Sequence, residues 1–587
     1  MRVFATEDWA GPHKIVVGID IGATQSAVAF TYLAPGKPQT LYRVQEWPGQ
    51  PAHKGQSRIP SQIYYDKECK PMYCGAEANE PPEEDEGMLV RHFKFHLHPT
   101  ALRRRQDITL EALPEGITLP RIYTDFMAYL FAHTKKYFCE HILNGGKIWE
   151  EYHDDITIVL SHPNGWGTKE QGFLRRAAIA AKLVRSGNAH SNVQFVSEAE
   201  ASVHFCMYHA DLHRSMNKGV HFVVCDAGGS TIDTTAYKVR NVSPLLELDE
   251  TKPSACVQAG GVSVDIEFQK YLSPIVNQLD APQETLQDYM QRGIREFEEN
   301  VKKEFNGTGV HRINLGARRK SSYEHLGIKH GKLILNNDTI KSFFNESVET
   351  AIECIRDQME SGCQHILLVG GFGDSPYLRR IINSEFAAAG CPVTVTNDPN
   401  AKAVADGSVL WCAKRSVVAR ATRMAYGIQV VTPYDRNNAE HCGRRTVVEC
   451  DGVEKVVGLW SQIVGQGTVM DAKDAVREGY MRFYDNPKAD LGHFSVAIYA
   501  YTGAGKNLNT WVVNKNGQRE QGFEEVCQIE ADLSGMRKAL KNNAQRLKRA
   551  GDWFHSTKFY RLDFKVGIQF GDTEIKAFLE WEQDVSA

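Results

Sequence analysis

Residues 223–239 read VVCDAGGSTIDTTAYKV. An apolar run ends in Asp226, a glycine pair and two hydroxyl residues follow, and a second strand-like run begins at Asp233. A continuous apolar run of this kind is typical of a strand buried on both faces. The turn is either an ordinary hairpin or a cradle for phosphate, because glycine lets the backbone approach a ligand closely and point N–H groups at it.

Two further turns of the same kind flank this stretch in the sequence. Residues 14–33, KIVVGIDIGATQSAVAFTYL, predict two strands around a turn that follows Asp20. Residues 365–382, HILLVGGFGDSPYLRRII, predict a strand, a glycine turn and a helix with Pro376 at its start. Each turn alone is a weak signal, since such turns are common. The repeated strand–Asp–Gly–Thr–strand pattern predicts a duplicated hairpin, and therefore two similar lobes that close over one ligand.

The composition narrows the class of protein. A chain of 587 residues is too long for one core, and about 150 residues per domain gives three or four lobes. The net charge of -4 gives no electrostatic reason to expect nucleic acid or an anionic membrane. The thirteen cysteines are scattered, which favours reduced thiols in the cytoplasm or the nucleus. No uninterrupted apolar segment of about 18 residues predicts a membrane span.

The order and spacing of the motifs resemble the actin, sugar-kinase and heat-shock-70 superfamily of ATPases. Within it, the chain is most similar to the heat-shock-70 (DnaK-type) chaperones, in the divergent branch typified by heat shock 70 kDa protein 12. The resemblance implies an α/β fold: a two-lobed actin-like (ribonuclease H-like) ATPase domain with duplicated βββαβα cores, then a smaller mainly-β module. The implied domains are 14–423, with lobes of roughly 14–205 and 206–423, and 424–587, which resembles a reduced substrate-binding domain.

The resemblance also implies an activity. The chain would bind ATP with Mg²⁺ and hydrolyse it slowly, and lobe closure around Mg-ATP would control the binding of protein clients or co-chaperones. A nucleotide-binding scaffold with little hydrolysis is one alternative. A small-molecule kinase of the same superfamily is another, although no base for a substrate hydroxyl and no sugar pocket can be identified. Neither nucleic acid nor a membrane span is expected.

Four residues carry the implied hydrolysis. Lys94, in RHFKFHL (91–97), would position the attacking water and the γ-phosphate, although without the resemblance it would be read as an ordinary surface lysine. Glu198 matches the acid of the family's acid–proline–threonine segment, and Asp226 and Asp233 would orient water and metal. Magnesium keeps most of its waters, so it would be held largely through water by Asp20, Asp226 and Glu198.

The remaining implied contacts are to phosphate and nucleoside. The phosphate side would contain Asp20, Gly22, Ala23, Thr24, Gly228, Gly229, Ser230, Thr231, Gly260 and Gly261. The nucleoside side would contain Glu299, Lys302, Lys303, Gly370, Gly371 and Asp374.

Several positions depart from the family pattern. Ala23 stands where the chaperones have threonine, Lys303 replaces an arginine, and Asp374 occupies the place of a second stacking arginine. Lysine stacks less well on adenine than a planar guanidinium, so the adenine clamp is expected to be altered. The family's valine–proline segment appears as VLSHPNGW (159–166) with a displaced proline. His92, His96 and His98 alternate without cysteines at metal-binding spacing, which favours a structural or surface role.

Overall fold

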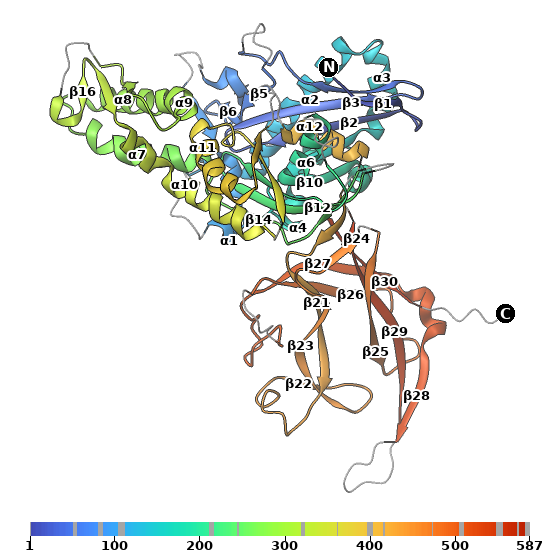
Figure 1. Cartoon of the computed structure of the whole chain (residues 1–587). Coiled ribbons are helices and arrows are strands. Elements are labelled where there is room, and N and C mark those ends of the chain that lie inside the picture. The colour runs from blue at the N-terminus through green and yellow to red at the C-terminus, as the bar shows by residue number, and fades with distance from the viewer. Residues whose placement is uncertain are drawn as a thin grey trace. The chain divides into compact units, whose positions relative to one another are not determined.

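A computed structural model of the chain describes most of its residues (Figure 1). The described residues are 2–50, 56–79, 86–103, 112–209, 216–242, 246–317, 323–360, 362–395, 403–414, 417–471, 473–503, 510–546, 556–571 and 574–581. The chain divides into two compact units, Met1–Val418 and Ala419–Ala587. The first unit is mixed α/β, whereas the second consists mainly of strands.

The first sheet of the first unit has the strand order β1-β4-β3-β2-β9-β10, with β5 beside β3. Its strands are β1 (Arg2–Asp8), β2 (Lys14–Ile21), β3 (Gln25–Leu33), β4 (Pro38–Arg43), β5 (Arg58–Pro60), β9 (Thr157–His162) and β10 (Val193–Ser197). The predicted hairpin of 14–33 is confirmed, because β2 and β3 pair antiparallel from Lys14–Leu33 to Ile21–Ser26. β9 lies parallel to β2, and β10 lies parallel to β9.

The second sheet of the first unit has the order β19-β18-β11-β12-β13, and β14 pairs with the first residues of β12. Its strands are β11 (His221–Ala227), β12 (Ile232–Asn241), β13 (Glu247–Glu250), β14 (Ala255–Val257), β18 (Cys363–Val369) and β19 (Val393–Val395). β11 and β12 form the antiparallel hairpin predicted from the opening motif, with Asp226 opposite Asp233. β18 lies parallel to β11, and β19 lies parallel to β18.

The two sheets therefore share one topology. The order β4-β3-β2-β9-β10 corresponds to β13-β12-β11-β18-β19, and the antiparallel and parallel pairings correspond as well. The predicted duplication of the hairpin is confirmed at the level of the whole sheet. In such a mixed sheet the loops after the parallel strands open at one edge, where ligands of α/β proteins bind.

Helices and two small sheets complete the first unit. The helices are α1 (Thr100–Arg103), α2 (Leu119–His141), α3 (Gly145–Tyr152), α4 (Thr168–Ala180), α5 (Ala189–Asn192), α6 (Glu198–His209), α7 (Gly261–Val276), α8 (Gln283–Glu296), α9 (Lys302–Glu304), α10 (Asn337–Gln358), α11 (Pro376–Phe386) and α12 (Ala403–Lys414). The small sheets have the orders β7-β6-β8, from β6 (Gln62–Tyr65), β7 (Pro71–Cys74) and β8 (Met88–Arg91), and β15-β17-β16, from β15 (His311–Asn314), β16 (Ile328–Lys329) and β17 (Lys332–Leu335). Pro376 begins α11, as predicted, after the capping residue Ser375.

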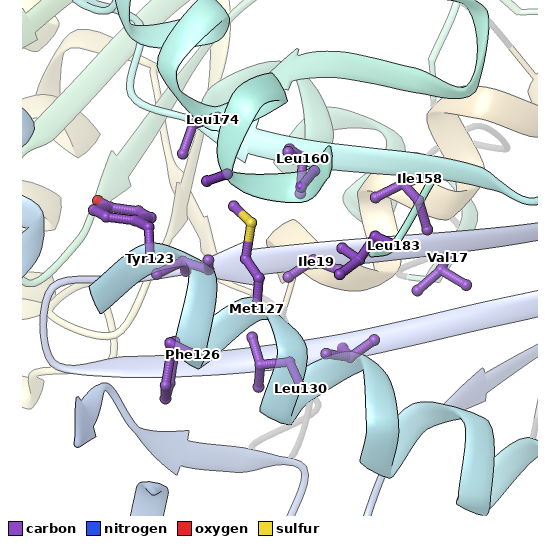
Figure 2. Close-up of a cluster of buried hydrophobic side chains, with 14 of the residues drawn as sticks. Val17, Ile19, Tyr123, Phe126, Met127, Leu130, Ile158, Leu160, Leu174 and Leu183 are labelled. Atoms are coloured by element: carbon purple, nitrogen blue, oxygen red, sulfur yellow. The ribbon is translucent and has the colours of Figure 1, made fainter. Parts of the chain in front are cut away.

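The core of the first sheet forms where α2 packs on β2 and β9 (Figure 2). Tyr123, Phe126, Met127 and Leu130 follow the helical spacing and are all buried. The same buried cluster contains alternate residues of the two strands and two residues in or just after α4; these are Val17, Ile19, Ile158, Leu160, Leu174 and Leu183. This packing buries one face of β2, whose end leads into the first glycine turn.

Helix α12 packs on the first sheet, although its residues fall within the 206–423 range expected for the second lobe. Val409 and Trp411 share a buried cluster with Val16 of β2 and Ala27 of β3. A side chain at Gly18 would lie 2.6 Å from the carbonyl oxygen of Ala405, so β2 and α12 touch backbone to backbone. The chain therefore returns to the first sheet, because this apolar helix is buried there.

The second unit contains two antiparallel sheets. One has the order β22-β23-β21-β26-β27, from β21 (Ala425–Pro433), β22 (Thr446–Val448), β23 (Glu454–Val464), β26 (Phe494–Tyr501) and β27 (Phe523–Ala531). The other joins β25 (Ala475–Tyr484), β28 (Lys541–Arg546) and β30 (Glu574–Glu580) to the long β29 (Ser556–Gly571), and β20 (Val417–Ala421) pairs with β24 (Val469–Asp471). Ile428 and Ile498, of the sheet that contains β21 and β26, share a core with Phe564 and Ile568 of β29.

Within the described part of the chain, no helix combines the length and apolar character needed to cross a bilayer.

Candidate functional site

Three turns of the first unit meet at one cavity: β2–β3, β11–β12 and β18–α11. The space between these turns, about 750 Å³, includes open solvent. The predicted residues that line it are Asp20, Gly22, Ala23, Thr24, Lys94, Glu198, Asp226, Gly228, Gly229, Ser230, Thr231, Gly370, Gly371 and Asp374. Residues from positions 20 to 374 thus gather in one place.

The β11–β12 turn is a tight loop with a second glycine segment beneath it. Gly228 N–H donates to the Thr231 carbonyl oxygen at 2.9 Å, which closes the turn. Gly260 lies underneath and does not line the cavity: its Cβ would be only 2.5 Å from the carbonyl carbon of Gly229. Gly261 also lies outside the lining and donates its N–H to the Gly228 carbonyl oxygen at 3.0 Å. Both residues support the turn from behind.

Lys94 and Glu198 form a buried ion pair at the cavity wall. Lys94 Nζ lies 2.6 Å from Glu198 Oε1, and both side chains are less than a tenth exposed. Lys94 lies in the short 3-10 turn Phe93–Leu97, whose buried Phe93 packs against Tyr123 of α2. Glu198 is the first residue of α6, directly after β10. The anchored aromatic residue turns Lys94 inward, so it is not the surface lysine that the sequence alone would suggest.

Three aspartates complete the charged part of the site. Asp20 and Asp226 are the next-to-last residues of β2 and β11. Each accepts a hydrogen bond from a serine hydroxyl: Ser161 donates to Asp20 at 3.1 Å, and Ser202 donates to Asp226 at 2.8 Å. Asp233 is fully buried behind the cavity, where the Asn164 N–H donates to its Oδ1 at 2.6 Å. Asp233 does not itself line the cavity.

These groups influence one another electrostatically. Burial alone would lower the pKa of Lys94, but Glu198 and Asp20 raise it above its ordinary value, so the ammonium is retained. Burial raises the pKa of Glu198, and Lys94 opposes that rise. Burial also raises the pKa of Asp233, opposed by hydrogen bonds from Thr231 and the Asn164 N–H. Three carboxyl groups, those of Glu198, Asp20 and Asp233, therefore act electrostatically on the one Lys94 ammonium.

Comparison with known proteins finds distant relatives of the chain. No family model matches the chain. Human heat shock 70 kDa protein 12A is 21% identical over 96% of this chain and 89% of its own length. Human heat shock 70 kDa protein 12B is 22% identical over 96% of this chain and 88% of its own length, and the mouse 12A protein is 21% identical over the same shares as its human counterpart.

The chain is a distant homologue of heat shock 70 kDa proteins 12A and 12B, a divergent branch of the heat-shock-70 family. This relationship implies an actin-like ATPase fold and nucleotide binding, and the mixed α/β structure with two similarly ordered sheets is consistent with that fold.

The expected nucleoside side is only partly assembled. Gly370 has φ +88°, and its Cβ would be 2.3 Å from Asp226 Oδ1, so glycine is required there. Glu299 and Lys303 are exposed on the π-helical turn Phe297–Val301 and on α9, and they do not line the cavity. Lys302 is also outside the lining and pairs with Asp265 at 2.5 Å.

The phosphate side shows a departure with a structural consequence. Ala23 is buried and packs with Phe95 and Val262 in a small apolar cluster. Ala23 lines the cavity but offers no hydroxyl there, at the position where the resemblance implies a threonine. Thr24, the next residue, lies against the second turn: a Cβ at Gly229 would be 3.0 Å from its hydroxyl oxygen.

Sequence reasoning missed several residues at the site. Arg58 of β5 lines the cavity and forms an ion pair with Asp374 at 3.5 Å. Gln25, Ala403 and Val404 also belong to the lining. No local signal marks these residues, because each reaches the cavity only through the packing of its strand or helix. Asn164 and Trp166 lie in VLSHPNGW, which attracted notice only for its displaced proline.

The carboxylates fit a hydrated cation better than a dehydrated one. Over the part of the chain that the structure describes, no three histidine, cysteine, aspartate or glutamate side chains are grouped closely enough to bind one metal ion directly. Magnesium keeps several waters and needs few protein oxygens. Asp20, Glu198 and Asp226 all line the same cavity, so they are suited to contact such an ion through water.

Proposed function

We propose that the chain is an ATP-binding, slowly ATP-hydrolysing protein of the heat-shock-70 type. Lobe closure around Mg-ATP would control the binding of protein clients or co-chaperones. The observation that carries the proposal is the buried Lys94–Glu198 pair beside Asp20 and Asp226, at a cavity formed by glycine turns of two similarly ordered sheets. An ordinary surface turn does not require a buried lysine–glutamate ion pair with two further aspartates beside it.

The finer fold is part of this proposal. The two sheets would be the ribonuclease H-like βββαβα cores of an actin-like domain spanning 14–423. The two lobes would be about 14–205 and 206–423, with α12 returning to the first. Residues 424–587 would be a reduced substrate-binding module. The two antiparallel sheets that share a core in this region support that interpretation.

The residues of the site would divide the work. N–H groups of Gly228, Gly229 and Ser230 and the Thr24 and Thr231 hydroxyls would hold phosphate oxygens. Lys94 would hold the γ-phosphate and the attacking water, and Asp233 would orient that water. A magnesium ion, held through water by Asp20, Glu198 and Asp226, would neutralise phosphate charge. Catalysis would consist of positioning and charge stabilisation, which is compatible with a slow rate.

A nucleotide-binding scaffold with little hydrolysis is the second candidate function. The residues expected to contact the nucleoside favour it. Asp374 stands at the cavity instead of a stacking arginine, and Lys303 and Glu299 lie outside the lining. The retained Lys94, Glu198 and Asp226 favour hydrolysis instead. Nothing at the cavity favours a small-molecule kinase. The cytoplasm would be the compartment, which rests on the scattered pattern of the thirteen cysteines in the sequence.

The test is calorimetric titration with ATP and ADP, with magnesium and with EDTA, combined with single-turnover release of γ-phosphate. We expect magnesium-dependent binding with slow release. Asp226→Asn should weaken binding or release at least tenfold. Asp338→Asn is the matched control, since that carboxylate is exposed on α10. Binding without release would favour the scaffold, and no binding of either nucleotide would refute the proposal.

A further inference from the structure

Asn164 connects the first sheet to the second at the floor of the site. It lies in the turn between β9, of the first sheet, and α4. Its side chain is fully buried, and its Nδ2 donates to Thr235 Oγ1 at 3.1 Å and to the Ala255 carbonyl oxygen at 3.3 Å. Its backbone N–H donates to Asp233 Oδ1 at 2.6 Å. All three partners lie on β12 or β14 of the second sheet.

The same turn touches the site from the first-sheet side. Ser161, at the end of β9, donates its hydroxyl to Asp20 Oδ1 at 3.1 Å. The Trp166 ring lies 5.7 Å from Lys94 Nζ, and its Nε1–H donates to His98 Nδ1 at 2.9 Å. Three residues of this six-residue segment thus contact three site residues from distant parts of the chain: Ser161 contacts Asp20, Asn164 contacts Asp233, and Trp166 contacts Lys94.

Asparagine is the side chain that this position requires. Its amide group supplies two N–H donors on a short stem, and the Thr235 hydroxyl and the Ala255 carbonyl accept from them. Aspartate has the same length but no N–H group, and glutamine would be one methylene too long for this buried site. With its side chain fixed in this way, the backbone N–H of residue 164 is held against Asp233.

We propose that Asn164 is a positioning residue for Asp233. By clamping on Thr235 and Ala255, it orients the Asp233 carboxylate relative to Lys94 and links the β9–α4 turn of one lobe to the water-orienting acid of the other. This inference rests on the proposed ATP hydrolysis. Asn164 touches neither nucleotide nor water in this scheme, so its loss should affect the chemical step and spare binding.

Single-turnover γ-phosphate release and nucleotide titration on the full chain test this inference. Asn164→Ala should slow release about 10- to 100-fold, because small misplacements of a catalytic group cost up to about 100-fold. The dissociation constants for ATP and ADP should stay within about twofold. If Asn164 were needed only for stability, its loss would reduce the release rate and the apparent nucleotide affinity together. After correction for the folded fraction, neither quantity would change.

Variants of Thr235, whose hydroxyl accepts from the Asn164 amide, keep the test independent of folding. Thr235→Val preserves the shape of the side chain but removes the hydroxyl, and it should slow release in the same direction. Thr235→Ser keeps the hydroxyl and should recover the lost rate. Asn164→Ala with Thr235→Val should be no slower than Asn164→Ala alone, because Asn164→Ala already removes the contact that Thr235→Val removes.

Asn192→Ala is the matched control. Asn192 is the last residue of α5 and lies outside the cavity lining, and its side-chain amide donates to the Asp154 carbonyl oxygen at 2.9 Å. Loss of this amide should leave the rate of phosphate release unchanged. If folded Asn164→Ala and Thr235→Val proteins release phosphate at the wild-type rate, the inference alone is overturned. If the wild-type protein releases no phosphate, the proposed hydrolysis is overturned and this inference with it.

Discussion

Lys94 Nζ lies 2.6 Å from Glu198 Oε1, although the two residues are 104 positions apart in the chain. The pair joins the 3-10 turn after β8 to the N-terminus of α6, and both side chains are buried. An ammonium held this way is expensive to desolvate, and breaking such a pair by removing one partner is strongly destabilising. Its position beside two glycine turns is therefore better explained by chemistry than by stability.

Replacement of Lys94 by methionine tests that explanation. The Lys94→Met protein should release γ-phosphate at least about 100-fold more slowly. It should also lose about 3 kcal/mol of unfolding free energy, because Glu198 is left buried without its partner. Denaturant unfolding and single-turnover assays would measure the two effects. Lys341→Met, which breaks an exposed pair with Asp338, should cost less than about 1 kcal/mol. Wild-type release by Lys94→Met would contradict the assigned role.

Neighbouring glycines at the third turn should respond differently to alanine. Gly370 has φ +88°, and its Cβ would lie 2.3 Å from Asp226 Oδ1 and 2.4 Å from the Ala227 carbonyl oxygen. Gly370→Ala should therefore destabilise the protein by about 2 kcal/mol or more and abolish nucleotide binding. Thermal unfolding and calorimetric titration would check both outcomes.

Gly371→Ala provides the internal control for that experiment. No atom lies within 4 Å of a Cβ at Gly371, and its φ is not positive. The variant should melt like wild type, so any loss of affinity reports a ligand that approaches the backbone there. Equal destabilisation by the two substitutions would mean that the turn is not held as the structure describes.

The Arg58–Asp374 pair should affect nucleotide release more than stability. Arg58 Nη2 lies 3.5 Å from Asp374 Oδ2, and the Asp374 side chain is about half exposed (54%). Such a pair contributes less than about 1 kcal/mol to the free energy of folding. It joins β5 of the first sheet to the turn after β18 at the cavity. Arg58→Gln and Asp374→Asn should each speed nucleotide dissociation about threefold or more in stopped-flow measurements.

Salt supplies the control for this pair. Raising the ionic strength screens exposed charges, so the wild-type dissociation rate should rise toward that of the variants, and the variants themselves should change little. A wild-type rate that is insensitive to salt, or variants with unchanged rates, would show that the pair does not restrain the nucleotide.

His92 should make stability fall in mild acid. Burial, aided by Arg91, lowers the pKa of His92 to about 4, whereas in the unfolded chain it is about 6.5. The unfolded state therefore binds more protons between these values, and stability is lost as the pH falls through that window. Between pH 7 and pH 5 this group should cost about 2 kcal/mol.

Comparison with His92→Asn isolates that contribution. His92 has a left-handed backbone, φ 58°, which asparagine tolerates better than most residues. The difference in unfolding free energy between the two proteins should change by about 2 kcal/mol between pH 7 and pH 5. A constant difference across this range would mean that His92 is not kept neutral by burial.

The sequence by itself determined the elements that depend on local pattern. The runs around Asp20 and Asp226 are apolar on both faces and end in a glycine turn, so each could be recognised as a hairpin of a buried sheet. Helix α11 could be predicted from Pro376 and its spacing. The repetition of one motif also indicated two similar lobes, and both sheets have the same strand order. Hydrophobic periodicity and turn-forming residues act over a few positions, so the strands, turns and helices that they specify can be predicted directly from the sequence.

Only the tertiary structure decided which side chains meet. Asn164 reaches Asp233, and Arg58 reaches Asp374, because two sheets from distant parts of the chain face one cavity. Conversely, Glu299 and Lys303, assigned to the nucleoside side by resemblance, are exposed outside the lining. These contacts depend on long-range packing, and a side chain's neighbours across a cleft leave no periodic signal in its own segment.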